Sequence, residues 1–302
     1  MGRPAGHSGC GPKKSIRGGG GYFRRAGSAR SGSGGGVRGD AAWRDAVSLL
    51  AIDGLCYSYP GREGVLRGIT AVAAGPEVIA IAGPNGAGKS TLLDVLAGQK
   101  TPAAGTCFLQ GRDALTMGRE ELCRIVAHVP QTIPSDVPFT VEEVVLTGRI
   151  PYGRGLYEND DDFAAMELAI ERTRLEAFRG RRYSTLSGGE KQRVLVAAAL
   201  CQQAPILLLD EPSAHLDPEN EALLWELFAS LRDAGHLILV VTHHLALAAQ
   251  NADRIWLLDG GRLAADGPPR DAMRPADLER VFRVPFHWHQ SAEGRVFLTY
   301  GR

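Results

Sequence analysis

The stretch that decides the fold is Gly83-Pro84-Asn85-Gly86-Ala87-Gly88-Lys89-Ser90. It follows an apolar run at 77–82 and precedes leucines in helical spacing, so we expect a strand, a glycine-rich loop and a helix. This is the context that the pattern G-x-x-x-x-G-K-[ST] requires. Glycines let backbone N–H groups turn towards phosphate oxygens, Lys89 can reach the β and γ phosphates, and Ser90 can offer its hydroxyl to Mg²⁺. The alternative, a glycine-rich turn that merely starts a helix, is disfavoured by this lysine and its flanks.

The sequence on either side of this loop predicts the rest of an α/β core. Four further runs are apolar on both faces, which is typical of buried strands in a parallel sheet: Ile125–Val129, Ile206–Leu209, Leu237–Val241 and Arg254–Leu258. An earlier strand is expected at Val47–Cys56. Strand signals disappear between Gln131 and Ser184, where Val141–Thr147 and Asp161–Phe178 have helical patterns. We therefore expect one mainly parallel sheet with a helical insertion, without internal repeats.

Two carboxylates, Asp210 and Glu211, end the apolar run at 206–209. Such a pair at the end of a strand can be a turn or a solvated edge, so alone it decides little. Beside a phosphate loop it suits phosphoryl transfer to water. Asp210 can hold Mg²⁺ through its water shell, and Glu211 can polarise the attacking water as general base.

The stretch Leu186-Ser187-Gly188-Gly189-Glu190 has two compatible interpretations. Ser187 and Glu190 have the spacing of a capping box for a helix that runs towards Cys201. A capped helix start with two glycines also presents free N–H groups and a positive dipole end. Those features suit the γ-phosphate of a second nucleotide.

Composition and charge disfavour several function classes. The chain has 302 residues, 44% of them hydrophobic, and 34 basic against 34 acidic residues, so no excess charge favours nucleic acid or anionic lipid as a partner. Residues 1–46 are rich in Gly, Ser and Arg, and we expect a disordered basic tail without the apolar stretch of a signal peptide. No apolar run approaches about 18 residues, so no membrane span is expected. Five cysteines without C-x-x-C spacing favour reduced thiols.

The order of P-loop, Leu-Ser-Gly-Gly-Glu, Asp-Glu and a later histidine resembles the ATP-binding-cassette (ABC) ATPases. The resemblance covers about 47–286 of the chain. It implies an α/β P-loop NTPase core with a mainly parallel sheet, an N-terminal antiparallel β subdomain and an inserted α-helical subdomain. The expected domains are the tail (1–46), an ATPase domain (47–290) whose helical subdomain spans about 132–203, and a C-terminal extension (291–302).

The resemblance also implies roles for single residues. Catalysis is assigned to Lys89, Glu211, Gln131, which senses Mg²⁺ and the attacking water, and His243, the switch histidine that contacts the γ-phosphate. Mg²⁺ is assigned to Ser90, Gln131 and Asp210. The residues implied in ATP binding are Tyr59, Gly83, Pro84, Asn85, Gly86, Ala87, Gly88, Lys89, Ser90, Thr91, Ser187, Gly188, Gly189, Glu190 and Asp217.

Several of these assignments have alternatives. Tyr59 matches the aromatic that stacks on adenine, Tyr57 on the same face is the second candidate, and both could simply pack the sheet. Asp217 precedes Pro218 and could serve only as a helix cap. His244 stands where the family usually has an acidic residue, which leaves the local hydrogen bonding open. The run 287–289, His-Trp-His, could hold a metal, but without a nearby Cys or carboxylate a strand or loop is favoured.

By resemblance, the chain is an ATP hydrolase coupled to transport, with ATP and Mg²⁺ as cofactors. Two copies are expected to form a head-to-tail homodimer that energises a membrane permease from the cytoplasmic face of the cell membrane. The segment Phe139–Tyr152, with Leu278–Phe282, resembles ATPase subunits of importers for iron-siderophore, haem and cobalamin, which receive cargo from a substrate-binding protein. The alternatives are another ABC transporter class, for metals or drugs, and an ABC ATPase acting on nucleic acid or ribosomes. Only the basic tail favours the last, so no nucleic-acid partner is expected.

Overall fold

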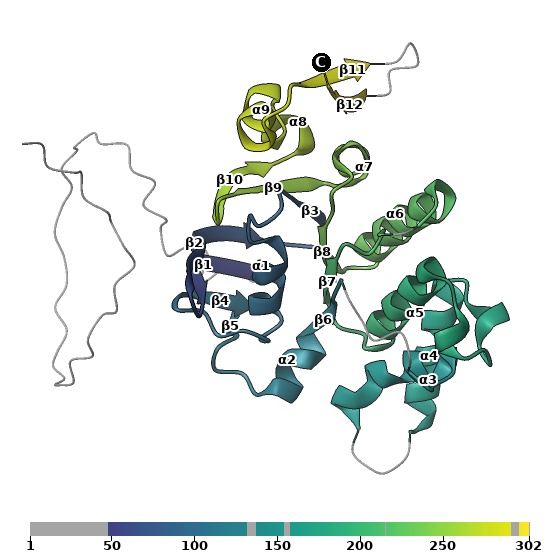
Figure 1. The fold of residues 1–302 in the computed structure, drawn as a ribbon. Helices are drawn as coiled ribbons and strands as arrows, with labels where there is room; N and C mark the ends of the chain where they lie inside the picture. Colours follow the sequence, from purple (N-terminus) through teal and green to yellow (C-terminus); the bar gives the residue numbers. More distant parts are fainter. Residues whose placement is uncertain (1–47, 132–136, 154–157, 215, 291–295, 302) are drawn as a thin grey trace, which may run out of the picture.

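A six-stranded sheet forms the centre of the fold in this computed structural model, which describes residues 48–131, 137–153, 158–214, 216–290 and 296–301 (Figure 1). The strand order is β10-β9-β3-β8-β7-β6, and only β10 runs antiparallel to its neighbour. The strands are β3 (Val78–Ala82), β6 (Val126–Val129), β7 (Ile206–Asp210), β8 (Leu237–Val241), β9 (Arg254–Asp259) and β10 (Arg262–Gly267). Every residue of β3, β7 and β8 is buried, which confirms the parallel core predicted from their apolar runs.

A second sheet of four antiparallel strands, ordered β2-β1-β4-β5, lies beside helix α1 (Lys89–Leu96) (Figure 1). Its strands are β1 (Leu50–Tyr59), β2 (Arg62–Ala73), β4 (Ala104–Leu109) and β5 (Arg112–Asp113). Apolar residues from β1 and β2 pack with Leu92 and Leu93 of α1 in one buried cluster. Strand β1 runs on through Tyr57 and Tyr59, as their alternation predicts, and Tyr59 pairs with Arg62 across the turn at Pro60 and Gly61.

The helical part of the chain has its own buried core, which includes Val145, Ile170, Tyr183 and Val194. Its elements are α3 (Val141–Leu146), the 3₁₀ turn η2 (Thr147–Tyr152), α4 (Asp160–Arg172), η3 (Glu176–Phe178), η4 (Tyr183–Thr185) and α5 (Gly188–Cys201). The prediction of one helix to Phe178 is wrong at its end. The hydroxyl of Thr173 donates to the Ala169 carbonyl at 2.7 Å, and Arg174 takes a left-handed φ of 55°, so α4 stops at Arg172.

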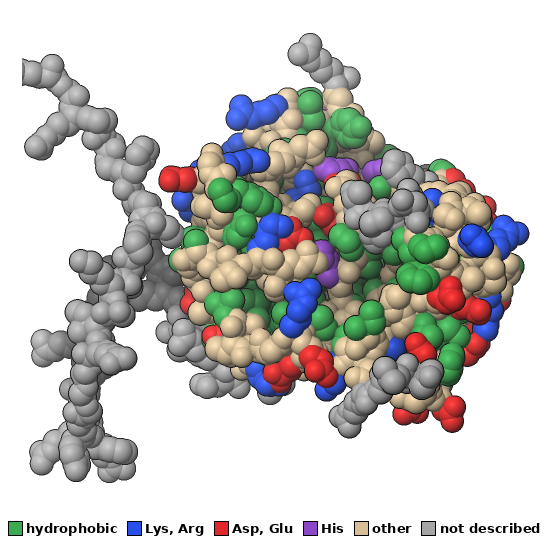
Figure 2. Space-filling view, turned by 60° about the horizontal axis from the view of Figure 1, so that its bottom comes forward, with side chains coloured by type: hydrophobic (Ala, Val, Ile, Leu, Met, Phe, Trp, Pro, Cys, Tyr) green, Lys and Arg blue, Asp and Glu red, His purple; other side chains and the backbone are tan. Residues whose placement is uncertain are grey.

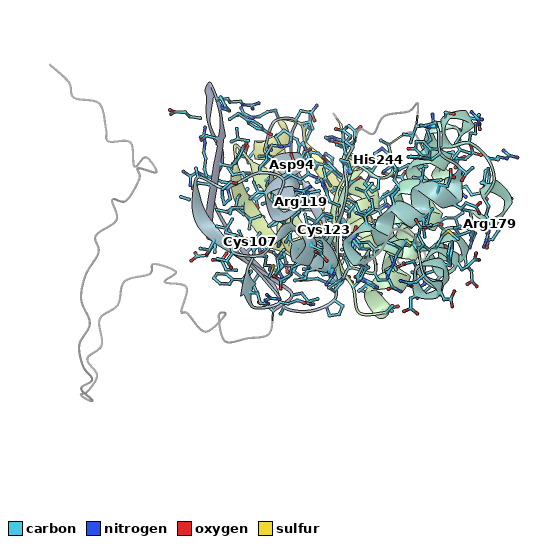
Figure 3. The ribbon with its side chains drawn as sticks, turned by 90° about the horizontal axis from the view of Figure 1, so that it is seen from below. Asp94, Cys107, Arg119, Cys123, Arg179 and His244 are labelled. Carbon is cyan, nitrogen blue, oxygen red and sulfur yellow. The ribbon has the colours of Figure 1, made fainter. Side chains whose placement is uncertain are left out.

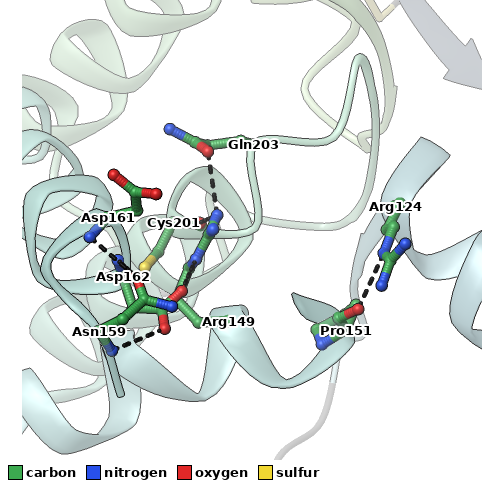
Figure 4. Close-up of polar contacts among 8 residues, drawn as sticks. All are labelled: Arg124, Arg149, Pro151, Asn159, Asp161, Asp162, Cys201 and Gln203. Atoms are coloured by element: carbon green, nitrogen blue, oxygen red, sulfur yellow. Dashed lines mark hydrogen bonds and ion pairs between the residues drawn. The ribbon is translucent and has the colours of Figure 1, made fainter. Parts of the chain in front are cut away.

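Arg149 joins three parts of this helical subdomain (Figure 4). Its Nε donates to Oδ1 of Asp162 at 2.8 Å, and its Nη1 donates to the Cys201 carbonyl and to Oε1 of Gln203. Both members of the ion pair are buried, with 8% of Arg149 and 4% of Asp162 exposed. The Arg149 guanidinium holds the pKa of Asp162 below its ordinary value. The pair therefore fixes η2 to the start of α4 and the end of α5.

The remaining elements are α2 (Arg119–Ile125), α6 (Pro218–Asp233), α7 (Leu245–Asn251), α8 (Pro269–Ala272), α9 (Pro275–Phe282) and the hairpin of β11 (Phe286–Gln290) and β12 (Val296–Tyr300). Of these, α2 packs in the same buried cluster as α1, whereas α6 to α9 and the C-terminal hairpin pack in a second cluster. His287 and His289 lie on β11, so the strand interpretation of that run is confirmed. Within the described ranges, no helix has the length and apolarity to cross a bilayer. The predicted tail, 1–46, lies outside the described residues.

Candidate nucleotide site

The chain order around the central sheet brings the predicted motifs to one edge. Strands β3, β8, β7 and β6 are parallel neighbours. The P-loop follows β3 and His243 follows β8. Asp210 ends β7, with Glu211 next in the chain, and Gln131 follows β6. Because the carboxyl ends of parallel strands face the same way, all four segments meet there. The topology thus assembles a site from residues up to 160 positions apart, counted from Gly83 to His243.

The P-loop backbone follows a path that requires glycine at two positions. Gly83 has a φ of 149°, and a Cβ there would lie 2.3 Å from the Leu258 carbonyl oxygen. Gly88 has a φ of 102°, and its Cβ would lie 2.9 Å from the carbonyl oxygen of Val65. No side chain fits either place, so the loop can pass close to β9 and β2 before α1 begins at Lys89.

A polar pocket of about 680 Å³, called here the P-loop pocket, opens in front of this loop. Tyr59 lines it, while Tyr57 packs against the core and meets Tyr59 edge-on at 5.0 Å between ring centroids. The position of Tyr59 favours it over Tyr57 as the adenine platform. The lining residues are Tyr59, Arg62, Val65, Asn85, Gly86, Gly88, Lys89, Ser90, Thr91, Gln131, Glu211 and His243.

Lys89 is buried against its own loop. Its Nζ donates to the carbonyl oxygens of Gly83 at 2.9 Å and Pro84 at 3.2 Å. Burial lowers the pKa of Lys89, and the carboxylates of Glu211 and Asp210 oppose that shift. A buried ammonium group among carbonyl oxygens is a strong phosphate donor, because little solvent competes for it.

Asp210 has the environment expected of a metal ligand. It is 5% exposed, and in the described part of the chain its Oδ1 has no hydrogen-bond partner. Burial raises the pKa of Asp210, and a hydrogen bond from Ser90 opposes the shift. An orphaned carboxylate oxygen beside a hydroxyl fits Mg²⁺, which prefers oxygen ligands and keeps several waters. The donor set thus suits the ion that the sequence predicts.

Glu211 is held from both sides. Nε2 of Gln131 donates to its Oε2 at 2.8 Å, and Nε2 of His243 lies 2.6 Å from its Oε1. A carboxylate only accepts, so the proton of this second bond is on the histidine nitrogen. Glu211 also has a left-handed φ of 52°, a strained conformation for a non-glycine residue that is frequent at functional sites.

The stretch 186–190 starts helix α5 and lies apart from the P-loop pocket. Glu190 donates its backbone N–H to the Ser187 hydroxyl at 3.3 Å and accepts the Ser187 N–H at 2.7 Å, which completes the predicted capping box. Among the described residues that line the P-loop pocket, none belongs to this stretch. Asp217 likewise caps α6, because its Oδ1 accepts the Asn220 N–H at 2.8 Å.

Two features of the site were not found from the sequence. Arg62 and Val65 of β2 line the P-loop pocket, and the signal that could have found Arg62 is its place directly after the Pro60-Gly61 turn beside Tyr59. The hydrogen bonding of His244 is now defined as well. Its Nδ1 lies 2.5 Å from Oε1 of Glu221, a carboxylate of α6 that is 6% exposed.

Known proteins of one family resemble this chain. Residues 66–214 match the ABC transporter family. The hemin import ATP-binding protein HmuV of Streptomyces coelicolor is 44% identical over 237 residues, which cover 78% of this chain and 84% of that protein. The cobalamin import ATP-binding protein BtuD of Halobacterium salinarum is 37% identical over 234 residues, 77% of this chain and 58% of the relative.

Solved structures agree on the fold. A metal-chelate type ABC transporter in an inward-facing conformation superposes with a TM-score of 0.73 at 23% identity, over 84% of this chain and 98% of that one. The dimeric bacterial ABC transporter cassette MJ0796 gives 0.66 at 26% identity, over 74% and 99%. The chain belongs to the ABC transporter family. Within it, the chain is an ATP-binding subunit of the kind that hydrolyses ATP to energise transport. The predicted family and fold class are confirmed.

Proposed function

We propose that this chain is the ATP-hydrolysing subunit of a haem importer, working as a homodimer beneath a membrane permease. The observation that supports haem as the cargo is the 44% identity of this chain to a hemin import ATP-binding protein, along most of both chains. The segment 139–152, predicted from sequence to resemble importers of this group, supports the same class. Cobalamin and iron-siderophore remain the alternatives, the first supported by the more distant relative.

The geometry supports a division of labour within the P-loop pocket. Glu211 is the general base, and the bonds from Gln131 and His243 hold its carboxylate towards the pocket. Lys89 and the loop N–H groups bind phosphate, and the Tyr59 ring supports the adenine. Ser90, Gln131 and Asp210 would hold Mg²⁺, which neutralises phosphate charge when it is bound.

The stretch 186–190, called the signature from here on, does not line the P-loop pocket, and this separation supports the dimer. Ser187, Gly188, Gly189 and Glu190 start a helix whose N–H groups suit phosphate, yet this stretch does not line the pocket of its own chain. A second copy in head-to-tail orientation would bring its stretch 187–190, with Asp217, against the first copy's P-loop. The related cassette MJ0796 is itself described as dimeric.

The surface of the helical subdomain supports a permease partner. Phe139 is 46% exposed and Ile150 is 75% exposed, and both belong to the segment that follows Gln131. Exposed apolar side chains of this kind suit a docking site for another protein. Because the segment follows Gln131 in the chain, a partner docked there would be connected to the nucleotide site. We place the chain on the cytoplasmic face of the membrane through this contact, with a substrate-binding protein as an indirect partner.

The decisive experiment is hemin uptake in cells that depend on this chain and its co-purified permease. We expect uptake with the parent chain and none with Lys89→Ala, whereas hemin-specific uptake by the Lys89→Ala variant would overturn the proposal. Uptake of cobalamin or of an iron-siderophore instead would assign that compound as the cargo.

The nucleic-acid alternative is tested by deleting 1–40. Because the chain has 34 basic and 34 acidic residues, we expect no nucleic-acid binding in either form and an unchanged ATPase activity after the deletion. On the face seen in Figure 2, basic and acidic side chains are interspersed.

A further inference from the structure

An apolar pocket of about 630 Å³, called here the hairpin pocket, lies between the start of α7 and the C-terminal hairpin. His244, Leu247, Phe282, Phe286, Leu298 and Tyr300 are among the residues that line it. His243 lines both this pocket and the P-loop pocket, so the two are adjacent. The size and the apolar lining with few polar groups are those of small-molecule sites. Apart from His243, no described residue assigned above to the nucleotide or to the dimer contact lines it.

Two of the described histidines line the hairpin pocket, and His244 is the one that is not bonded to Glu211. Figure 3 shows it between the part of the molecule that holds Asp94 and the helical part that holds Arg179. Its Nδ1 is 2.5 Å from the buried Glu221 carboxylate, and 54% of its side chain is exposed. Because a carboxylate only accepts, Nδ1 carries the proton shared with Glu221, and Nε2 is the ring nitrogen left to bind a ligand. In the described part of the chain, this Nε2 has no hydrogen-bond partner.

An imidazole whose second nitrogen is held by a carboxylate is already oriented to act as an axial ligand of a metal ion. Metal-binding histidines commonly donate their second N–H to a carboxylate, which fixes the ring and raises its basicity. The described ranges contain no group of three or more His, Cys, Asp or Glu residues that could enclose a bare ion. One histidine is sufficient, however, when the ligand is a planar chelate that brings its own equatorial donors.

The walls of the pocket suit the flat faces of such a chelate. Phe286 is the middle of an aromatic row, with ring centroids 5.7 Å from Phe282 on one side and 5.7 Å from Tyr300 on the other. Tyr300 is 74% exposed and Val284 is 38% exposed, so apolar surface continues to the mouth of the pocket. Phe286 itself is buried, so Phe282 and the exposed Tyr300 offer the ring surface on which a flat apolar partner can pack.

We propose that the hairpin pocket binds an iron porphyrin, with Nε2 of His244 as the axial ligand and Glu221 as the carboxylate behind it. This inference rests on the proposed function, because its ligand is the proposed cargo after entry into the cell. His243, the next residue, is hydrogen-bonded to Glu211. Porphyrin bound to His244 therefore restrains the loop that carries His243, and ATP turnover falls when imported porphyrin accumulates.

The test is a titration of the purified full chain with hemin, followed by the Soret absorption. We expect one saturable site with a histidine-ligated spectrum. His244→Ala removes the ligand, and Glu221→Gln, which keeps the shape but not the charge, weakens binding by roughly 10–100-fold. The double variant His287→Ala with His289→Ala is the matched control, since both of its histidines are exposed on β11 outside the pocket lining. Metal-free protoporphyrin binds much more weakly than hemin if coordination is the main contribution.

Two results would overturn the proposal: hemin affinity unchanged in His244→Ala with the melting temperature preserved, or affinity lost in the β11 double variant but not in His244→Ala. A further readout is the ratio of ATPase rates with and without hemin, which should fall below one for the parent and stay at one for His244→Ala. The ATPase rate without hemin and the uptake assay test the proposed function separately, so each proposal can fail alone.

Discussion

Nε2 of His243 and Oε1 of Glu211 lie 2.6 Å apart, although the two residues end different strands. Gln131 donates to the other carboxylate oxygen at 2.8 Å. The proposed base is thus already oriented by residues from the ends of β6 and β8, its two neighbours in the sheet. A base fixed in this way loses little conformational entropy when the attacking water arrives.

Glu211→Gln should retain ATP binding and lose turnover. The amide keeps the shape of the side chain but cannot accept a proton, so we expect a fall on the order of 10²–10⁴-fold. Phosphate release and nucleotide affinity measure the two effects. Glu279→Gln, an exposed glutamate of α9, is the matched control and should hydrolyse ATP at the parent rate. Hydrolysis near the parent rate in Glu211→Gln would remove this residue from its role.

The composite site can be tested by complementation. In a Glu211→Gln background, we expect Lys89→Ala to disable the P-loop and Ser187→Arg to disable the signature, so neither variant dimerises with Mg-ATP alone. Mixed, they can form a heterodimer in which the P-loop of one chain and the signature of the other are both intact. Light scattering should detect dimers only in the mixture and in the unmodified Glu211→Gln protein. Equal dimerisation of each variant alone would contradict a head-to-tail arrangement.

Asp210→Asn should separate folding from metal binding. Because burial raises the pKa of Asp210, its ionised form is disfavoured in the fold, and this cost is present at neutral pH and falls as pH drops through the raised value. The amide removes the charge, so we expect a higher melting temperature without nucleotide. The additional stabilisation by Mg²⁺ in the presence of ATP should be lost. Thermal melts with ATP, with and without EDTA, measure both, and an equal EDTA effect in parent and variant would exclude Asp210 as a ligand.

Arg149→Met should destabilise the helical subdomain by about 3–5 kcal/mol, because it leaves the buried Asp162 carboxylate without its cation. Since Arg149 lowers the pKa of Asp162, the stabilisation by this ion pair is complete above about pH 4 and is lost as pH falls through the lowered value. The free energies of unfolding of parent and variant, measured in denaturant from pH 7 to below pH 4, should therefore converge as the pH falls. Arg179→Met breaks the exposed pair with Glu167 and should cost only about 0–1 kcal/mol.

Gly148→Ala tests the contact between η2 and α5. An added Cβ would lie 2.1 Å from the Ala198 carbonyl oxygen and 3.0 Å from the Gln202 nitrogen, both of them backbone atoms. We expect a loss of roughly 1–3 kcal/mol, the usual cost of overpacking. Gly180→Ala is the control, since its Cβ meets nothing within 4 Å. Equal stability of the two variants would show that η2 can move away from α5.

The parallel core could be predicted from sequence because β3 and β8 are apolar at every position and β7 is apolar up to Asp210. The P-loop and the histidine at 243 each follow one of these strands closely. The capping box at Ser187 was predictable because it is local: its two partners, Ser187 and Glu190, lie within one helical turn. The meeting of Gln131 and Glu211 was not, because it depends on strand order between segments 80 residues apart. Both residues were assigned to the attacking water from the sequence, but no contact between their side chains was predicted.

Arg149 shows why other parts could not be predicted. Arginine and aspartate normally mark a solvated surface, and nothing near Arg149 or Asp162 in sequence reveals that both become buried. The end of α4 was missed because the pattern of 161–178 stays helical in spacing, while the Thr173 hydroxyl and the left-handed Arg174 stop the helix. The hairpin pocket depends on β12, a strand absent from the sequence prediction.

Helix α5 has a mechanical consequence. Its first turn contains the signature glycines. At its last turn, Gly148 packs against the Ala198 backbone, and the Cys201 carbonyl accepts a hydrogen bond from Arg149. The helix has 14 residues, a rod about 21 Å long, without proline or an internal break. In the proposed dimer, a displacement of the segment around Ile150 would therefore move α5 as one rigid body. Helix α5 is then the mechanical link between the proposed permease contact and the residues that meet the partner's nucleotide.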